Sequence, residues 1–378
     1  MATKPRSIFE DVTETQKPTA TTGVIDAKSR GARDGIRIWL MALFALVVAI
    51  IVVGGLTRLT DSGLSITEWA PISGSVPPLN ADAWNAEFEA YKQIPEYIEQ
   101  NNGMSLSEFK SIYWWEWGHR QLGRIVGLVW AVGFVGFLAT RKIPTGWTGR
   151  LVLIGALGGL QGVIGWWMVH SGLQEGMLDV ASYRLATHLG LAFVILGFIA
   201  WYVFLLGRRE ADLMQARRAG ETKLFTLSTG LLVFAFLQVL LGALVAGIDA
   251  GRAFPTWPLM GSGFFPPDPF QLSPVWRNFF EDAGLVQFMH RMSGYLLFGF
   301  SVFVWLKARR SPNTKTRFGF NVIFALMVVQ MLIGIATVMY SAPVQIAIIH
   351  QFMAVLLWVA ILRGRYLARY PLAQSVRG

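Results

Sequence analysis

Residues 38–56 read Ile-Trp-Leu-Met-Ala-Leu-Phe-Ala-Leu-Val-Val-Ala-Ile-Ile-Val-Val-Gly-Gly-Leu, a run without a charged side chain. A helix of about 18 or more apolar residues is long enough to cross the hydrocarbon core of a bilayer. A second run of this kind extends from Leu185 to Leu206. Segments like these predict an all-α integral membrane protein.

The composition of the 378-residue chain agrees with this prediction. Charged residues make up 15% of it, whereas soluble domains carry about 25%. The chain has no cysteine, which excludes a disulfide framework, a thiolate nucleophile, an iron–sulfur cluster and a zinc–thiolate site. The net charge of +10 is explained by basic loops on one side of a membrane, so we expect no nucleic-acid partner.

Eight apolar segments predict eight transmembrane helices, with boundaries that hold to a few residues. Glycine is frequent inside them, and small residues let helix backbones approach closely in lipid. The expected spans are residues 38–56, 120–139, 151–169, 185–206, 224–247, 287–306, 319–340 and 346–362.

Lysine and arginine gather in alternate connections, which orients the bundle by the positive-inside rule. They precede the first span, occupy the second-to-third, fourth-to-fifth and sixth-to-seventh connections, and follow the last span. We therefore expect both termini in the cytoplasm. The first segment contains acids such as Glu10 and Asp11, unlike the acid-poor transit peptides of organelles, which favours a bacterial inner membrane.

Two connections on the opposite side are long, at residues 57–113 and 248–286. Loops of that length are usually functional or disordered. These two are rich in Trp, Phe, Pro and Gly, unlike a disordered tract. We expect them to form ordered caps over the outer face.

The two halves of the chain resemble each other, which predicts two parallel four-helix repeats related by an axis along the membrane normal. Each half has four expected spans. The expected parts are a flexible cytoplasmic segment at 1–37, halves at 38–206 and 224–362, and a cytoplasmic tail at 363–378. The matches are His119-Arg120 with His290-Arg291, Thr187-His188 with Ile349-His350, Gln161-x-x-x-Gly165 with Gln330-x-x-x-Gly334, and Thr67-Glu68-Trp69 with Pro255-Thr256-Trp257.

Four of the five histidines occupy equivalent places, each within the first few residues of an even-numbered span. Ionisable residues inside spans are costly and indicate function. Haem needs two imidazoles at matched height on facing helices, and imidazole is a standard haem ligand. His119 with His188 is expected to form one site, and His290 with His350 another. His170 has no counterpart, and its role stays open.

Charged residues beside these histidines suit the rest of a haem. Arg120, Arg124 and Arg291 follow them closely, and arginine binds carboxylates such as the haem propionates through paired hydrogen bonds. The alternative is an interfacial arginine that reaches for lipid headgroups. Glu116 shares a helix face with His119, while the matching position in the second half is Gln287. That difference suggests one reactive site and one redox or structural site.

With these motifs the chain resembles the haem A synthase family, from the first span to the last. The most specific stretches are residues 54–69, residues 249–261, and residues 113–120, which read Tyr-Trp-Trp-Glu-Trp-Gly-His-Arg. Some members carry a cysteine pair in outside loops. This chain has none and resembles the cysteine-free branch of alphaproteobacteria and mitochondria, so a thiol–disulfide role is excluded.

The resemblance implies an oxidoreductase that converts the C8 methyl group of haem O to a formyl group, giving haem A for terminal oxidases. It assigns haem O to His119 and His188, and haem b to His290 and His350. It also implicates Glu116 in function. The implied partners are membrane lipid, an electron donor and the enzyme that makes haem O, with a homo-oligomer left open.

Two other classes fit some of the features. A di-haem cytochrome b that transfers electrons would need the four histidines but neither Glu116 nor large aromatic caps. A transporter fits the parallel repeat, but its midplane helix breaks are missing from the sequence. If both axial positions of haem O are filled, oxygen cannot reach the iron. Either one histidine of the pair His119 and His188 is labile, or another oxidant attacks the methyl group.

Overall fold

The computed structural model describes residues 24–374, and no strand forms within them. Eight helices are long, and short helices and single 3₁₀ turns fill the connections. The long helices are α1 (Val24–Leu59), α4 (Leu106–Ala139), α5 (Thr148–Gly172), α6 (Ser182–Leu206), α8 (Thr222–Gly247), α10 (Ala283–Ala308), α11 (Thr314–Met339) and α12 (Val344–Arg369).

Seven of these helices, within the described part of the chain, are long and apolar enough to cross a membrane. They are α1, α4, α5, α6, α8, α11 and α12. Helix α10 has 26 residues but is not among them. Its first half carries Gln287, His290 and Arg291, which lower its mean hydropathy. The chain therefore has the build of a multi-pass membrane protein.

Two helices begin well before the expected span. Helix α4 starts at Leu106 because Ser105 and Glu108 form a capping box, in which each side chain binds the other residue's backbone N–H. Helix α1 starts at Val24 and takes in residues 24–37 of the segment expected to be flexible. Residues 1–23 and 375–378 lie outside the described residues.

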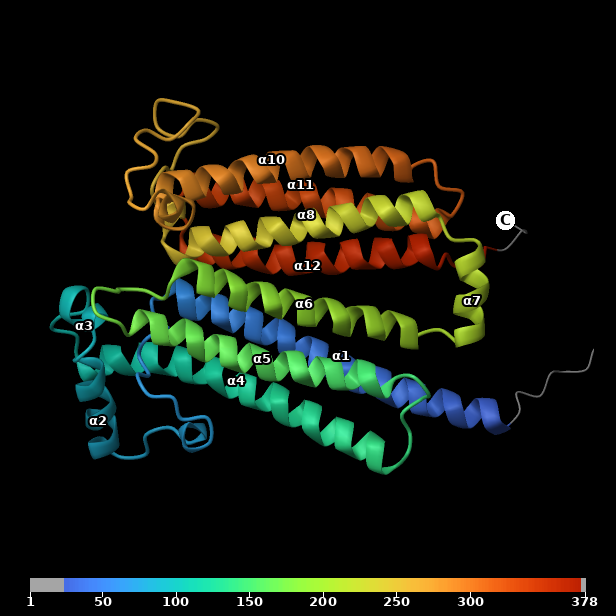
Figure 1. Ribbon diagram of the computed structural model, residues 1–378, viewed down its shortest axis with the longest axis horizontal. Helices are drawn as coiled ribbons and strands as arrows, with labels where there is room; N and C mark the ends of the chain where they lie inside the picture. Colours follow the sequence, from blue (N-terminus) through green and yellow to red (C-terminus); the bar gives the residue numbers. More distant parts are fainter. Residues whose placement is uncertain (1–23, 375–378) are drawn as a thin grey trace, which may run out of the picture.

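The long helices run side by side in two groups (Figure 1). Helix α1 packs on α4 and α6, and α5 on α4 and α6. Likewise α8 packs on α10 and α12, and α11 on α10 and α12. The groups meet where α6 contacts α8 and α12, and where α1 contacts α12. Their shared core includes Leu43, Leu196, Leu231 and Ile361, all buried.

Both long loops lie at one end of the bundle, and α7 (Glu210–Arg218) lies at the other (Figure 1). The first loop contains η2 (Ser73–Ser75), α2 (Ala81–Tyr91) and α3 (Pro95–Glu99). The second contains η3 (Ala250–Arg252), η4 (Val275–Arg277) and α9 (Asn278–Glu281). Aromatic side chains build the core of the first loop, where Phe88 stacks on Phe109 of α4 at 5.0 Å between ring centroids.

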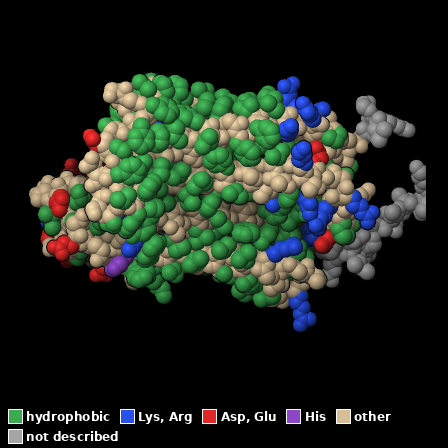
Figure 2. All heavy atoms as spheres, turned by 45° about the horizontal axis from the view of Figure 1, so that its top comes forward, with side chains coloured by type: hydrophobic (Ala, Val, Ile, Leu, Met, Phe, Trp, Pro, Cys, Tyr) green, Lys and Arg blue, Asp and Glu red, His purple; other side chains and the backbone are tan. Residues whose placement is uncertain are grey.

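Charged side chains separate along the bundle axis. Figure 2 shows an apolar belt around the middle, Lys and Arg at the end that holds α7, and Asp and Glu at the end that holds the loops. This distribution is the one that a membrane imposes on a helical bundle.

Candidate functional site

The four repeated histidines lie on α4, α6, α10 and α12, all of them part-buried. His188, His290 and His350 lie about two turns into their helices. His119 lies more than three turns into α4. His119 was expected at the start of a membrane span at 120–139. It lies in the interior of α4 because the capping box starts this helix at Leu106.

His119 and His188 face each other across the first helix group. Their ring centroids are 6.4 Å apart, and the ring planes meet at 88°. His290 and His350 occupy the equivalent places on α10 and α12.

Each histidine ring lies against a glycine of a neighbouring helix. A β-carbon built at Gly54 would lie 2.9 Å from Nε2 of His119. The Cε1 atoms of His188, His290 and His350 would lie 2.9, 3.1 and 2.9 Å from β-carbons at Gly165, Gly242 and Gly334. Contacts this short leave no room for a side chain. The glycines form a cradle for the rings.

Glu116 is 2% exposed and ties the first loop to α4. Its Oε2 accepts hydrogen bonds from the Ser65 hydroxyl at 2.7 Å and the Ile66 amide at 2.8 Å. Its Oε1 accepts from Nε and Nη2 of Arg120 at 3.0 and 2.6 Å. All four contacts are donors, as an ionised carboxylate requires.

The three predicted arginines bind loop carbonyl groups in this structure. Arg120 also donates to the carbonyl oxygens of Ile66 and Glu68. Arg124 donates to those of Ala70 and Pro71. Arg291 donates to the carbonyl oxygens of Phe254 and Leu259 and to Oε1 of Gln287. Each arginine therefore fastens an outer loop to the helix that carries a histidine.

His170 lies apart from the four paired histidines. It is exposed near the end of α5, and its ring stacks on Trp166 at 5.8 Å between centroids. Gln174 reaches its ring from the next turn at 3.4 Å. The structure gives it no histidine partner among the described residues.

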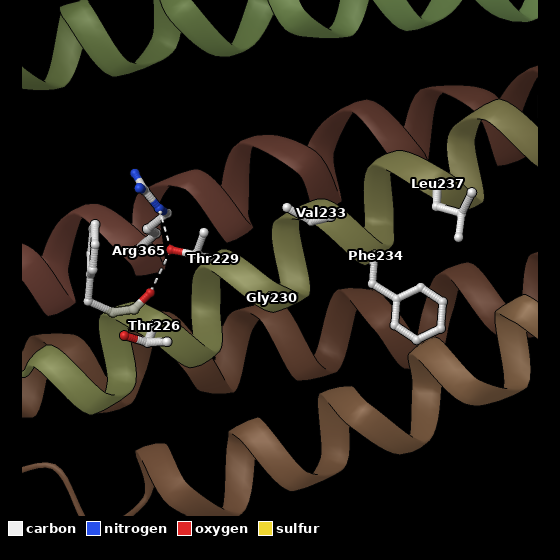
Figure 3. Close-up of a pocket in the computed structure, with 8 residues that line it drawn as sticks. Thr226, Thr229, Gly230, Val233, Phe234, Leu237 and Arg365 are labelled. Atoms are coloured by element: carbon white, nitrogen blue, oxygen red, sulfur yellow. Dashed lines mark hydrogen bonds between the residues drawn. The ribbon is translucent and has the colours of Figure 1, made fainter.

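A groove of about 790 Å³ follows α8 (Figure 3). It runs from Phe225 to Leu237, and Arg365 of α12 stands at its edge. Nε of Arg365 donates to the Thr229 hydroxyl at 2.9 Å, which itself donates to the Phe225 carbonyl group at 2.8 Å. No histidine lines this groove, so it is separate from the candidate site.

The residues present fit haem better than a bare metal ion. No group of three His, Cys, Asp or Glu side chains within residues 24–374 is placed to hold an ion. Two facing imidazoles with glycines behind them suit a flat macrocycle with two axial positions. The buried amide oxygens of Gln161, Gln238 and Gln330 have no partner, although each amide lies beside a histidine ring.

Several residues of the site were not singled out from the sequence. Gly54, Ser65 and Gln238 carry no ionisable or metal-binding group. They contribute only through contacts with a neighbouring helix or loop. One signal was available, because Gln238-x-x-x-Gly242 repeats the spacing found at Gln161 and Gln330. Its third occurrence marks the third helix that supports a histidine.

Comparisons with known proteins agree along the whole chain. The model of the family described as cytochrome oxidase assembly protein matches residues 37–362. The chain is 67% identical to a heme A synthase of Ruegeria sp. (strain TM1040) over 377 residues, which cover 99% of both chains. It is 62% identical to that of Ruegeria pomeroyi, covering 99% of both chains. It is 59% identical to that of Paracoccus denitrificans, covering 99% of this chain and 98% of the relative.

Proposed function

The chain belongs to the cytochrome oxidase assembly protein family, and from this membership we infer that it is a haem A synthase. It is an oxidoreductase that converts the C8 methyl group of haem O to the formyl group of haem A. Haem O is its substrate and haem A its product. The observation that best supports a location for this reaction is the facing pair of His119 and His188, with the buried Glu116 on the same helix face as His119.

We propose that the two histidine pairs serve different haems. His119 and His188 hold haem O, and His290 and His350 hold a resident haem b. The support is a chemical difference between two similar sites, Glu116 in the first half and Gln287 in the second. Haem iron, when bound, supplies the redox chemistry of oxygen insertion. The chain's own side chains orient the macrocycle and exclude water.

Glu116 is proposed to exchange protons beside the reacting haem. Its carboxylate is buried three residues before His119, on the same helix face. The Arg120 side chain and the Ile66 amide hold it in place. In the second half Gln287 accepts from Arg291 in the same way, so the loop anchor is kept while the acid is absent. A group positioned for proton transfer contributes about 10²–10⁴-fold to a rate.

Arg120, Arg124 and Arg291 are proposed to contact haem propionates as well as loops. Each already lies one to five residues after a histidine and binds a carbonyl group of a long loop. A guanidinium group has five N–H donors, which allows a carbonyl and a carboxylate to be bound together.

We also propose that α10 is an eighth membrane span, so that the bundle is two parallel four-helix repeats. The packing of α1 on α4 and α6 resembles that of α8 on α10 and α12. Residues 38–206 would then form the haem O half and 224–362 the haem b half. The basic end shown in Figure 2 favours cytoplasmic termini in a bacterial inner membrane.

Two partners follow from the chemistry of the reaction. Oxidation by molecular oxygen requires an electron donor. Haem O is poorly soluble in water, so direct transfer from the enzyme that makes it is proposed. A homo-oligomer is a further proposal that size measurement in mild detergent would test.

The haems bound to the purified protein test the function. We expect detergent-solubilised protein from cells that make haem O to yield haem b with haem O or haem A after extraction and chromatography. His290→Ala and His350→Ala should lose haem b because each removes a ligand. Haem b alone, unchanged when haem O is supplied, would instead identify a di-haem electron carrier.

Replacing Glu116 tests the role of the acid. Glu116→Gln keeps the hydrogen-bond acceptor for Arg120 and copies the second half, so haem should stay bound while haem A formation falls by at least about 100-fold. Glu108→Gln removes a charge on the same helix at an exposed cap and is the control. Full haem A formation by Glu116→Gln would mean that Glu116 only anchors the first loop and has no role in proton transfer.

A further inference from the structure

Three of the four histidines form a hydrogen bond with a glutamine from a neighbouring helix. In each case Nε2 of the amide donates to the histidine's own carbonyl oxygen and lies closest to Nδ1 of its ring. For Gln161 and His188 these distances are 2.9 and 3.2 Å. For Gln238 and His290 they are 3.0 and 3.1 Å, and for Gln330 and His350 they are 3.1 and 3.3 Å. In the pairs of Gln238 and Gln330 the amide Nε2 also lies 3.4 and 3.5 Å from the ring's Nε2.

The partnerless amide oxygens indicate what the glutamines do when iron is bound. A ligating imidazole normally donates its second ring N–H to a fixed acceptor, which sets the ring's orientation and basicity. Oε1 of Gln161, Gln238 and Gln330 is buried without a partner. A rotation of the amide that brings Oε1 to Nδ1, where it accepts that proton, gives up the present hydrogen bond from the amide Nε2 to the histidine's carbonyl oxygen. With the ring proton on Nδ1, Nε2 of the ring is bare and can bind iron.

His119 has no such support. Among the described residues, no hydrogen bond reaches its ring. The place of the glutamine is taken by Ile50, four residues before Gly54 as Gln238 is four residues before Gly242. The surroundings match as well. Ile50 lies 3.7 Å from a β-carbon built at Gly123, and Gln238 lies 3.2 Å from one at Gly294.

We propose that His119 is the exchangeable iron ligand among the four histidines. Gln161, Gln238 and Gln330 are positioning residues that keep the other three histidines bound to iron. This inference rests on the proposed function, because it concerns the haem held by His119 and His188. With haem bound, a small ligand such as oxygen would approach the iron from the side of α4, the helix that also carries Glu116. An exchangeable His119 also removes the conflict between two axial histidines and access of oxygen to the iron.

Carbon monoxide binding to the reduced protein tests the asymmetry without relying on turnover. The full chain is loaded with haem A and haem b, whose absorption bands differ because the formyl group shifts that of haem A. Carbon monoxide should change the haem A band and leave the haem b band alone. A response from both haems, from haem b alone, or from neither would overturn the proposal.

Ile50→Gln gives His119 the missing support. It should weaken carbon monoxide binding at the haem A site by about 10–100-fold, the usual effect of a residue that supports a metal ligand. Ile50→Leu, which adds no amide, is the matched control and should bind as the parent does. Equal binding by all three proteins would overturn the proposal.

A second pair of variants keeps the test independent of how Ile50→Gln folds. His119→Ala should retain the first-half haem in a five-coordinate, high-spin form, whereas His188→Ala should lose it. Loss in both, or retention only in His188→Ala, would count against His119 as the exchangeable ligand. Failure here with normal haem A formation would refute only this inference, whereas absence of haem A from the parent protein would refute the function itself.

Discussion

Each of the four histidine rings occupies space that a glycine on a neighbouring helix leaves free. The ring of His188 lies where the side chain of residue 165 would be, and the same holds at Gly54, Gly242 and Gly334. Helix α5 carries other glycines that do not serve a histidine. A β-carbon at Gly158, Gly159 or Gly162 would meet nothing within 4 Å. Only Gly165 on this helix is therefore required by the site.

We expect Gly165→Val to reduce haem binding in the first half by about 10-fold or more, because a displaced ligand costs affinity on that scale. The matched control is Gly162→Val, on the same helix but in open space. Haem content per protein, measured after extraction, gives the comparison. Equal loss in both variants would mean that glycine serves helix packing in α5 rather than the ring of His188.

The residues of the site were predictable where they carry their own chemistry. His119, His188, His290 and His350 were found because histidine is rare in this chain and these four repeat. Gln238 and Gly54 were not, because an amide or a missing side chain acts only through the helix opposite. The arginines show the converse. Their positions were predicted, but the loop carbonyls that they bind depend on loop folding that no local pattern reports.

At the scale of elements, a cluster of charged side chains lies where the first loop leaves α1. Arg58 at the end of α1 binds Asp61 and Asp249 at 2.8 Å each and lies 3.6 Å from Asp179. Beside it a cavity of about 20 Å³ is lined by Glu96 of α3, large enough for about one water molecule. Oε2 of Glu96 is buried without a partner. The loop thus carries an acid that lacks the hydrogen bonds an ionised form needs.

The stability of this loop should decrease as pH rises. Burial raises the pKa of Glu96 to about 8, and the nearby charge of Asp179 adds to the effect. In the unfolded loop its pKa would be about 4.3, so the folded loop binds the extra proton between these values. The contribution is complete below the unfolded pKa and is lost as pH rises through about 8.

Hydrogen exchange of α2 and α3 between about pH 6 and 9, corrected for its intrinsic pH dependence, measures this change. Protection should fall with pH in the parent protein and stay level in Glu96→Gln, which cannot ionise. Glu99→Gln, exposed on the same short helix, should behave as the parent does. A parent profile that is flat across this range would contradict a protonated Glu96.

Helix boundaries were predicted best where the apolar composition of the segment defines them. The expected 224–247 and the observed α8 differ by two residues at one end. The predicted span 120–139 was shorter than α4 because the first turns of this helix lack a continuous apolar pattern. Phe109, Tyr113 and Glu116 in these turns are nevertheless buried on one face. Those turns pack on the loop rather than on lipid. Helix α7 was also unforeseen, since its nine residues are mostly polar.

At the scale of the whole molecule, two similar groups of helices form one bundle with chemically different ends. Both long loops lie at one end, while basic side chains gather at the other (Figures 1 and 2). His188, His290 and His350 lie about two turns into helices that start at the loop end. The proposed repeat would place the two proposed haem sites at similar depth. The positive-inside rule favours the end with the loops as the outer side. Orientation is therefore the property on which the location of the reaction depends.

The absence of cysteine allows this orientation to be measured with single substitutions. Ser262→Cys places a thiol in the exposed second loop, and Thr145→Cys places one in the exposed connection between α4 and α5. A membrane-impermeant maleimide added to intact spheroplasts should label Ser262→Cys at once and Thr145→Cys only after permeabilisation. The parent chain, with no thiol, should stay unlabelled throughout. The reverse pattern would place the loops, Glu116 and the haem sites near the cytoplasm. Haem A would then have to form on that side, and the basic connections would have crossed the membrane against the positive-inside rule.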